Sequence, residues 1–191
     1  MGQAKQKRLK IDNMTTGLSD EAKTVFFTAN KLFDRVIKSR NVHGMCYHST
    51  FFLYQYLKDK FNISTSPIIG YVNDGSDDVM ISHAWLEYDG KKTDVSLGVT
   101  TDHNIWPVGD VIILDQIVHS GHKYSYHVTM TSAGLRYQSK ALSGPDAEIA
   151  RHKMEEHLVM QARAKVPASI RSYLEGAPAG LRYDELSTYL D

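Results

Sequence analysis

The first half of the chain begins with two segments whose apolar residues have helical spacing. In residues 25–37 they recur at intervals of three and four, and Ser19 and Asp20 ahead of them are typical of a helix start. In residues 44–61 they leave almost no polar face, which is typical of a helix buried on all sides. The pattern predicts an amphipathic helix followed by a buried central helix that carries Cys46 in its first turn.

The middle of the chain changes to the patterns of β-strands. Residues 66–72 and 79–88 have strand composition, and residues 91–95 follow the dipeptide Asp89-Gly90, a strong signal for a tight hairpin turn. These three segments therefore predict neighbouring strands, the last two of them joined as a hairpin. Further strands are predicted over residues 111–114 and 123–130.

Helical patterns return in the C-terminal part, over residues 149–165, 168–175 and 182–190. The order of helices, strands and further helices predicts an α+β fold with an antiparallel sheet. The length of 191 residues fits one domain with extensions.

Three regions are expected within this domain. Residues 1–17 hold several Lys and Arg among polar residues and few apolar ones, which predicts a flexible basic arm. Residues 18–135 contain all the predicted strands and form the predicted core. Residues 136–191 are expected to be a C-terminal helical extension packed on that core.

The composition and charge exclude some classes of binding partner and of cellular location. Twenty-two basic residues balance 22 acidic ones, so the formal net charge is zero and no nucleic acid is expected as a partner held by bulk positive charge. No apolar run reaches the roughly 18 residues of a membrane span, and no secretory signal is visible. The single cysteine excludes an intrachain disulfide and favours a cytoplasmic location, with delivery into another cell as an effector left open. No cofactor is expected.

Cys46 is the first candidate for chemistry. Its predicted place at the start of a buried helix puts the sulfur beside backbone N–H groups that have no partner within the helix. These groups and the helix dipole favour negative charge, on a thiolate or on an oxyanion. A small buried core cysteine is the alternative from position alone.

The predicted hairpin brings a histidine and an aspartate together. A two-residue turn at Asp89-Gly90 places Asp94 opposite Trp85, and His83 lies two positions from Trp85 on the same strand. His83 and Asp94 are then diagonal neighbours on one face, with Cβ atoms roughly 7 Å apart, which their side chains can bridge. This is the arrangement in which a carboxylate orients a catalytic imidazole.

These residues resemble the transglutaminase-like branch of the papain-like cysteine superfamily. The resemblance covers residues 40–98 and keeps the order and approximate spacing of the motifs. The segments that carry it are Gly44-Met45-Cys46 before the apolar helix, Gly70-Tyr71-Val72, His83-Ala84-Trp85-Leu86-Glu87, and Asp94.

The resemblance implies a transglutaminase-like core in which a nucleophile helix packs on an antiparallel sheet. It implies Cys46 as nucleophile, His83 as general base and acid, Asp94 as the orienting residue, and a thioester intermediate. The expected substrate is an amide of a peptide or protein. Protease, amidase, deamidase and transglutaminase outcomes stay open, as does the oligomeric state.

Two questions stay open beside this hypothesis. A second oxyanion donor is needed besides the Cys46 amide, and Asn41, His43 and His48 are the candidates by proximity in sequence. A catalytically inactive transglutaminase-like module that binds partners is the alternative function. His43, Cys46 and His48 do not have the spacing of a recognised zinc site, so no metal is expected.

Overall fold

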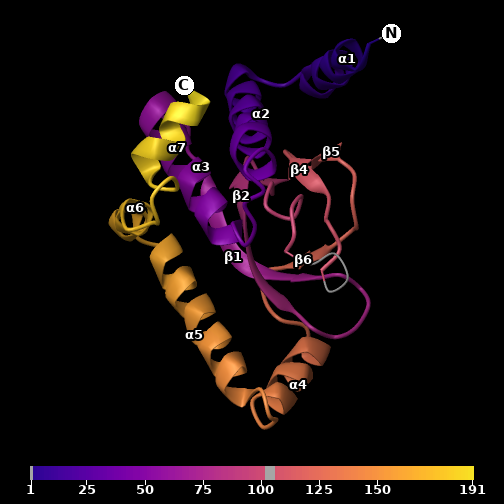
Figure 1. Ribbon diagram of the computed structural model, residues 1–191, viewed down its shortest axis with the longest axis vertical. Helices are drawn as coiled ribbons and strands as arrows, with labels where there is room; N and C mark the ends of the chain where they lie inside the picture. Colours follow the sequence, from indigo (N-terminus) through magenta and orange to yellow (C-terminus); the bar gives the residue numbers. More distant parts are fainter. Residues whose placement is uncertain (1, 102–105) are drawn as a thin grey trace.

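In the computed structural model, which describes residues 2–101 and 106–191, the chain has an α+β fold with an antiparallel sheet (Figure 1). The helical elements are α1 (Gln3–Thr15), α2 (Asp20–Leu32), the π-helical segment η1 (Phe33–Lys38), α3 (Cys46–Phe61), α4 (Ser132–Ala141), α5 (Ala147–Ala164), α6 (Pro167–Glu175) and α7 (Tyr183–Leu190). The strands are β1 (Ser66–Asn73), β2 (Ile81–Tyr88), β3 (Lys91–Thr93), β4 (Val111–Ile113), β5 (Gln116–His119) and β6 (Ser125–His127). The predicted α+β class is confirmed.

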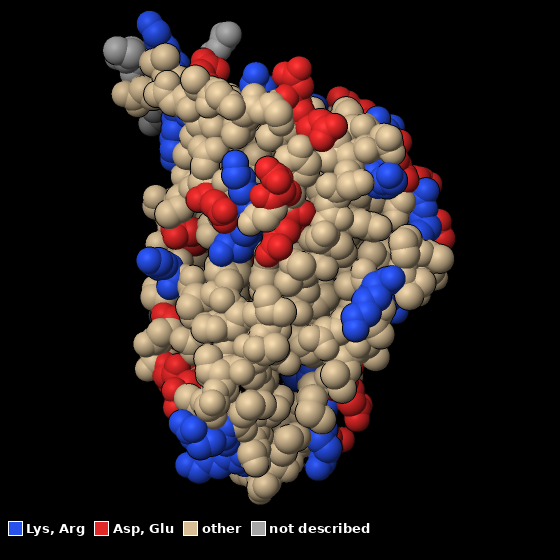
Figure 2. All heavy atoms as spheres, turned by 180° about the vertical axis from the view of Figure 1, so that it is seen from behind, with Lys and Arg blue, Asp and Glu red and all other residues tan. Residues whose placement is uncertain are grey.

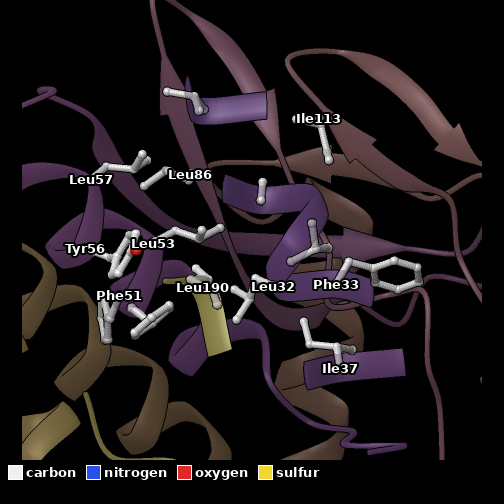
Figure 3. Close-up of a cluster of buried hydrophobic side chains, with 14 of the residues drawn as sticks. Leu32, Phe33, Ile37, Phe51, Leu53, Tyr56, Leu57, Leu86, Ile113 and Leu190 are labelled. Atoms are coloured by element: carbon white, nitrogen blue, oxygen red, sulfur yellow. The ribbon is translucent and has the colours of Figure 1, made fainter. Parts of the chain in front are cut away.

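Helices α2 and α3 form the centre of the core. Ser19 caps α2 by accepting a hydrogen bond from the Ala22 amide at 3.2 Å, and the apolar stripe of α2 is buried, as predicted. Residues 47–53 of α3 are all buried, so the predicted central helix is also confirmed. Figure 3 shows side chains from α2, η1, α3, β2, β4 and α7 converging in one cluster.

The main sheet has the strand order β3-β2-β1-β6, and each pair is antiparallel. The turn between β2 and β3 has positive φ at both Asp89 (51°) and Gly90 (69°), the backbone that a two-residue type I′ turn requires. Leu86 pairs with Thr93, so the predicted hairpin and its register are confirmed. This turn therefore fixes which residues of β2 and β3 share a face.

A second, two-stranded sheet continues from the end of β3. The backbones of Asp94 and Ile112 exchange two hydrogen bonds of 2.8 Å, which link the segment after β3 to β4. Strand β5 pairs with β4 and was not predicted from the sequence. Its turn is built on Leu114 and Asp115, both with positive φ, and contains none of the glycine or asparagine residues that usually mark such turns.

The N-terminal segment differs from the prediction of a flexible arm. Residues Gln3–Thr15 form helix α1, and the Lys10 ammonium donates a 2.6 Å hydrogen bond to the Val118 carbonyl. The side-chain amide of Gln116 also donates a hydrogen bond of 2.9 Å to the Met14 carbonyl. The residues of this segment have high intrinsic helix propensity but no amphipathic pattern, so periodicity alone overlooked the helix.

The C-terminal helices belong to the same core as α2 and α3. Ile170 and Leu174 of α6 and Leu186 of α7 are completely buried in the shared hydrophobic cluster. Helix α4 was not predicted, and the expected boundary between residues 135 and 136 falls inside it. Residues 136–191 are therefore continuous with the rest of the fold.

The surface carries both signs of charge. On the face seen in Figure 2, Lys and Arg side chains lie in small groups next to Asp and Glu, mostly away from its centre. Within residues 2–101 and 106–191, no helix is long and apolar enough to cross a membrane.

Candidate active site

Cys46 is the first residue of α3, and its side chain is half-buried. The chain enters this helix through Gly44, whose φ of 69° is in the region that favours glycine. In the part of the chain that the structure describes, no side chain caps the start of α3 at Met45. The N-terminal amides beside the sulfur are thus not occupied by a capping group.

His83 lies in β2 and is 3% exposed. Its Nε2 is 2.6 Å from Oδ2 of Asp94, which lies just beyond the end of β3. The Cys46 side chain lies close enough to the same imidazole to raise its pKa. Because Nε2 is engaged by Asp94, Nδ1 is the nitrogen that remains for the thiol. The structure therefore brings together the three residues that the sequence predicted as a triad.

Asp94 is also almost completely buried, and both of its carboxylate oxygens are hydrogen-bonded. Oδ1 accepts from the Ser96 amide at 2.9 Å and from the Ser96 hydroxyl at 2.8 Å. Oδ2 accepts from Tyr126 at 2.7 Å, in addition to His83. Four donors thus compensate the loss of water around this buried carboxylate.

Tyr126 is a site residue that the sequence analysis missed. Strand β6 brings it to the sheet face that carries His83, and its ring meets the Trp85 ring edge-on at 5.3 Å between centroids. The Lys92 ammonium lies 3.6 Å from the centre of the Tyr126 ring, a cation–π contact. These contacts hold the phenol against Asp94, and they depend on pairing between β1 and β6 that no local pattern announces.

The pKa values of the pair move in opposite directions. Burial alone lowers the pKa of His83, but the charge of Asp94 and the hydrogen bonds to Asp94 and Cys46 outweigh it and raise the pKa to about 10. Burial raises the pKa of Asp94, but the His83 charge and the hydrogen bonds it accepts lower it below its usual value of 3.8. At neutral pH the pair is therefore an imidazolium beside a carboxylate.

The three oxyanion candidates lie in different surroundings. Asn41 and His43 are exposed in the segment between η1 and α3. His48 is buried, and its Nε2 donates a 2.7 Å hydrogen bond to the Leu181 carbonyl. This donor is already occupied, so His48 helps to attach the segment before α7 and does not fit the oxyanion role. The structure does not join Asn41 or His43 to the Cys46–His83–Asp94 group.

A second polar chain runs beside the triad. The Tyr47 hydroxyl is hydrogen-bonded to the Ser82 hydroxyl, which in turn is hydrogen-bonded to Nδ1 of His157 in α5. Tyr47 follows Cys46 and Ser82 precedes His83, so two of these hydrogen-bonded residues are next in sequence to Cys46 and His83. No local pattern in the sequence predicts these hydrogen bonds, because His157 comes from a distant helix.

Comparison with known proteins adds no assignment, since no protein-family model, curated protein or solved structure matches the chain. Among residues 2–101 and 106–191 there is also no group of three His, Cys, Asp or Glu side chains arranged to hold a metal ion.

The hydrogen bond from Tyr126 to a charged acceptor predicts a stability difference between two matched variants. Tyr126→Phe should lower the free energy of unfolding by about 1.5–3 kcal/mol, because a buried carboxylate loses a donor. Tyr124→Phe removes a hydroxyl that donates to the neutral Pro107 carbonyl at 2.8 Å, and should cost about 0.5–1.5 kcal/mol. Urea denaturation at pH 7 measures both, and equal losses would contradict the role given to Tyr126.

The raised pKa of His83 predicts how stability depends on pH. Its contribution is complete below the unfolded-state pKa of 6.5 and disappears as the pH rises toward about 10. The stability advantage of the wild type over His83→Gln should therefore decline between these two values, by up to about 1.4 kcal/mol per pH unit. Urea titrations across this range test it, with His152→Gln, an exposed histidine on α5, as the control. A difference that does not change with pH would refute the ion pair.

Proposed function

We propose that the protein catalyses cysteine-dependent acyl transfer or hydrolysis on an amide of a peptide or protein. The observation that carries the proposal is the buried His83 imidazole, which Asp94 holds at Nε2 while the Cys46 thiol is its other partner. A charged, hydrogen-bonded pair that is buried beside a half-buried cysteine costs free energy to form, and such pairs are common at catalytic sites.

The first half of the reaction forms a thioester. The Cys46 sulfur attacks the amide carbonyl carbon, and the electron pair of the C=O bond moves to its oxygen. The uncapped amides at the start of α3 stabilise this oxyanion. When the oxyanion collapses, the C–N bond breaks and the leaving amine takes the proton carried by His83, so that the thioester and a neutral imidazole remain.

The second half of the reaction releases the acyl group. Neutral His83 accepts a proton from an incoming water or amine, which attacks the thioester carbonyl carbon. The C–S bond then breaks, and the Cys46 sulfur leaves with its electron pair beside the regenerated imidazolium. Water gives hydrolysis or deamidation, and an amine gives transamidation. Asp94 keeps the imidazole oriented and its charge balanced in both halves.

We further propose that the core is transglutaminase-like. The proposal is supported by the order of the site residues along the chain, with a cysteine at the start of a central helix, a histidine on a strand and an aspartate just after the next strand. It is also supported by the packing of that helix against an antiparallel sheet, which matches the architecture the resemblance implies.

The charged His83 imidazole beside Cys46 predicts an unusually reactive thiol. At pH 6, Cys46 should react with iodoacetamide at least about tenfold faster than N-acetylcysteine, because the adjacent imidazolium stabilises negative charge on the sulfur. His83→Ala should remove this advantage, whereas His152→Ala should keep it. Intact mass spectrometry over time gives the rates, and every alkylated cysteine is Cys46, since the chain has one cysteine. A wild-type rate no faster than that of N-acetylcysteine would contradict the proposed enzyme and favour a binding module.

A further inference from the structure

A cavity of about 190 Å³ lies between the main sheet and helices α4 and α5. Its walls are mostly apolar and are formed by Tyr71, Met80, Met130, Ala141, Ala150 and Met154, among others. Methionine side chains adapt their shape to a guest more readily than branched ones. The cavity thus has the lining of a site for an apolar group.

The hydrogen-bonded side chains of His157, Ser82 and Tyr47 connect this cavity to the residue that follows Cys46. Ser82 and His157 line the cavity, and Ser82 is hydrogen-bonded to Tyr47, the residue after Cys46. Figure 1 shows the N-terminal end of α3 directed toward the region between β1 and α5. The cavity is therefore joined through hydrogen bonds to the side chain of the residue that follows Cys46.

The charges around the cavity favour an uncharged guest. His157 is 3% exposed, and burial lowers its pKa, so the imidazole is neutral at pH 7. Lys153 is a cation in the lining, but its side chain is 66% exposed and its ammonium is 2.9 Å from the Glu156 carboxylate. A charged group in the cavity would lose its hydration without gaining a dedicated partner.

One polar atom at this wall has no partner. Nε2 of His157 is buried and makes no hydrogen bond to any residue that the structure describes. The opposite nitrogen is held by Ser82, and the Tyr71 ring stacks on the imidazole at 4.3 Å between centroids. A buried polar atom without a partner costs free energy, which a hydrogen bond between Nε2 and a bound amide can recover.

The volume limits the size of the guest. A dry cavity of about 150 Å³ in another protein accommodates benzene. A volume of about 190 Å³ therefore suits one large side chain, such as that of leucine, methionine or phenylalanine, and is too small for a drug-sized ligand.

We infer that this cavity receives a large apolar side chain of the peptide substrate, at a residue near the amide that Cys46 attacks. The inference rests on the proposed function and adds the substrate class, with residues 130–157 selecting it. Leucine and asparagine have similar size and shape but opposite polarity, so they form the sharpest pair of probes.

The first experiment measures binding without catalysis. With ¹³C-methyl methionine labelling, N-acetyl-leucinamide at millimolar concentration should shift the methyl signals of Met80, Met130 and Met154. Met14 and Met160, which do not line the cavity, should stay unchanged and serve as internal controls. N-acetyl-asparaginamide should bind about tenfold more weakly. Equal shifts with both amides would overturn the inference.

The second experiment uses substitutions that fill the cavity. Ala150→Phe should abolish the leucinamide shifts, and Ala162→Phe, the same change at an exposed position of α5, should keep them. Ala141→Leu fills the cavity from α4 and replaces Ala150→Phe if that variant does not fold. Shifts that persist in a folded, filled variant would overturn the inference.

The third experiment tests whether the cavity affects which reagents label the Cys46 thiol. A chloromethyl ketone of acetyl-Leu-Gly should label Cys46 about tenfold faster than its acetyl-Asn-Gly counterpart, and Ala150→Phe should bring this ratio close to one. The iodoacetamide rate should stay the same in Ala150→Phe. Leucinamide binding without any preference between the two ketones would overturn the inference while leaving the proposed function intact. Slow iodoacetamide alkylation of the wild type would overturn both.

Discussion

The hydrogen bond between His83 and Asp94 is the interaction on which the candidate site depends. Both side chains are buried, and a buried charge without a partner would cost several kcal/mol. The surrounding residues are arranged to meet that cost, since Ser96 and Tyr126 supply the other hydrogen bonds to the carboxylate. The same arrangement keeps a proton on the imidazole beside Cys46, which is the charge that the proposed mechanism needs.

The proximity of His83 and Asp94 was predictable from the sequence because it depends on one short stretch of the chain. A two-residue turn at Asp89-Gly90 leaves one register for β2 and β3, and the strand period then places His83 and Asp94 on one face. The position of Cys46 was predictable for a similar reason, since the apolar pattern of residues 44–61 predicts a helix with Cys46 in its first turn, and α3 begins at that residue. Each inference needed only one short, continuous stretch of the chain.

The parts that were missed depend on contacts between distant segments or on weak local signals. Tyr126 reaches Asp94 only because β6 pairs with β1, and His157 reaches Ser82 only because α5 packs on the same sheet. Helix α1 was missed because it lacks an apolar stripe, and β5 because its turn lacks glycine. The contact with Ser96 had a usable signal, since an aspartate carboxylate often accepts a hydrogen bond from the backbone amide two residues further on.

The trapping of an acyl group on Cys46 tests the central claim most directly. On incubation with p-nitrophenyl acetate at pH 7, the wild type should gain one acetyl group that hydroxylamine removes, as expected of a thioester. Folded Cys46→Ala should gain none, and His83→Ala should be acylated about 10²-fold more slowly. An acetyl group that appears equally in Cys46→Ala, or a folded wild type that acquires none, would contradict the account.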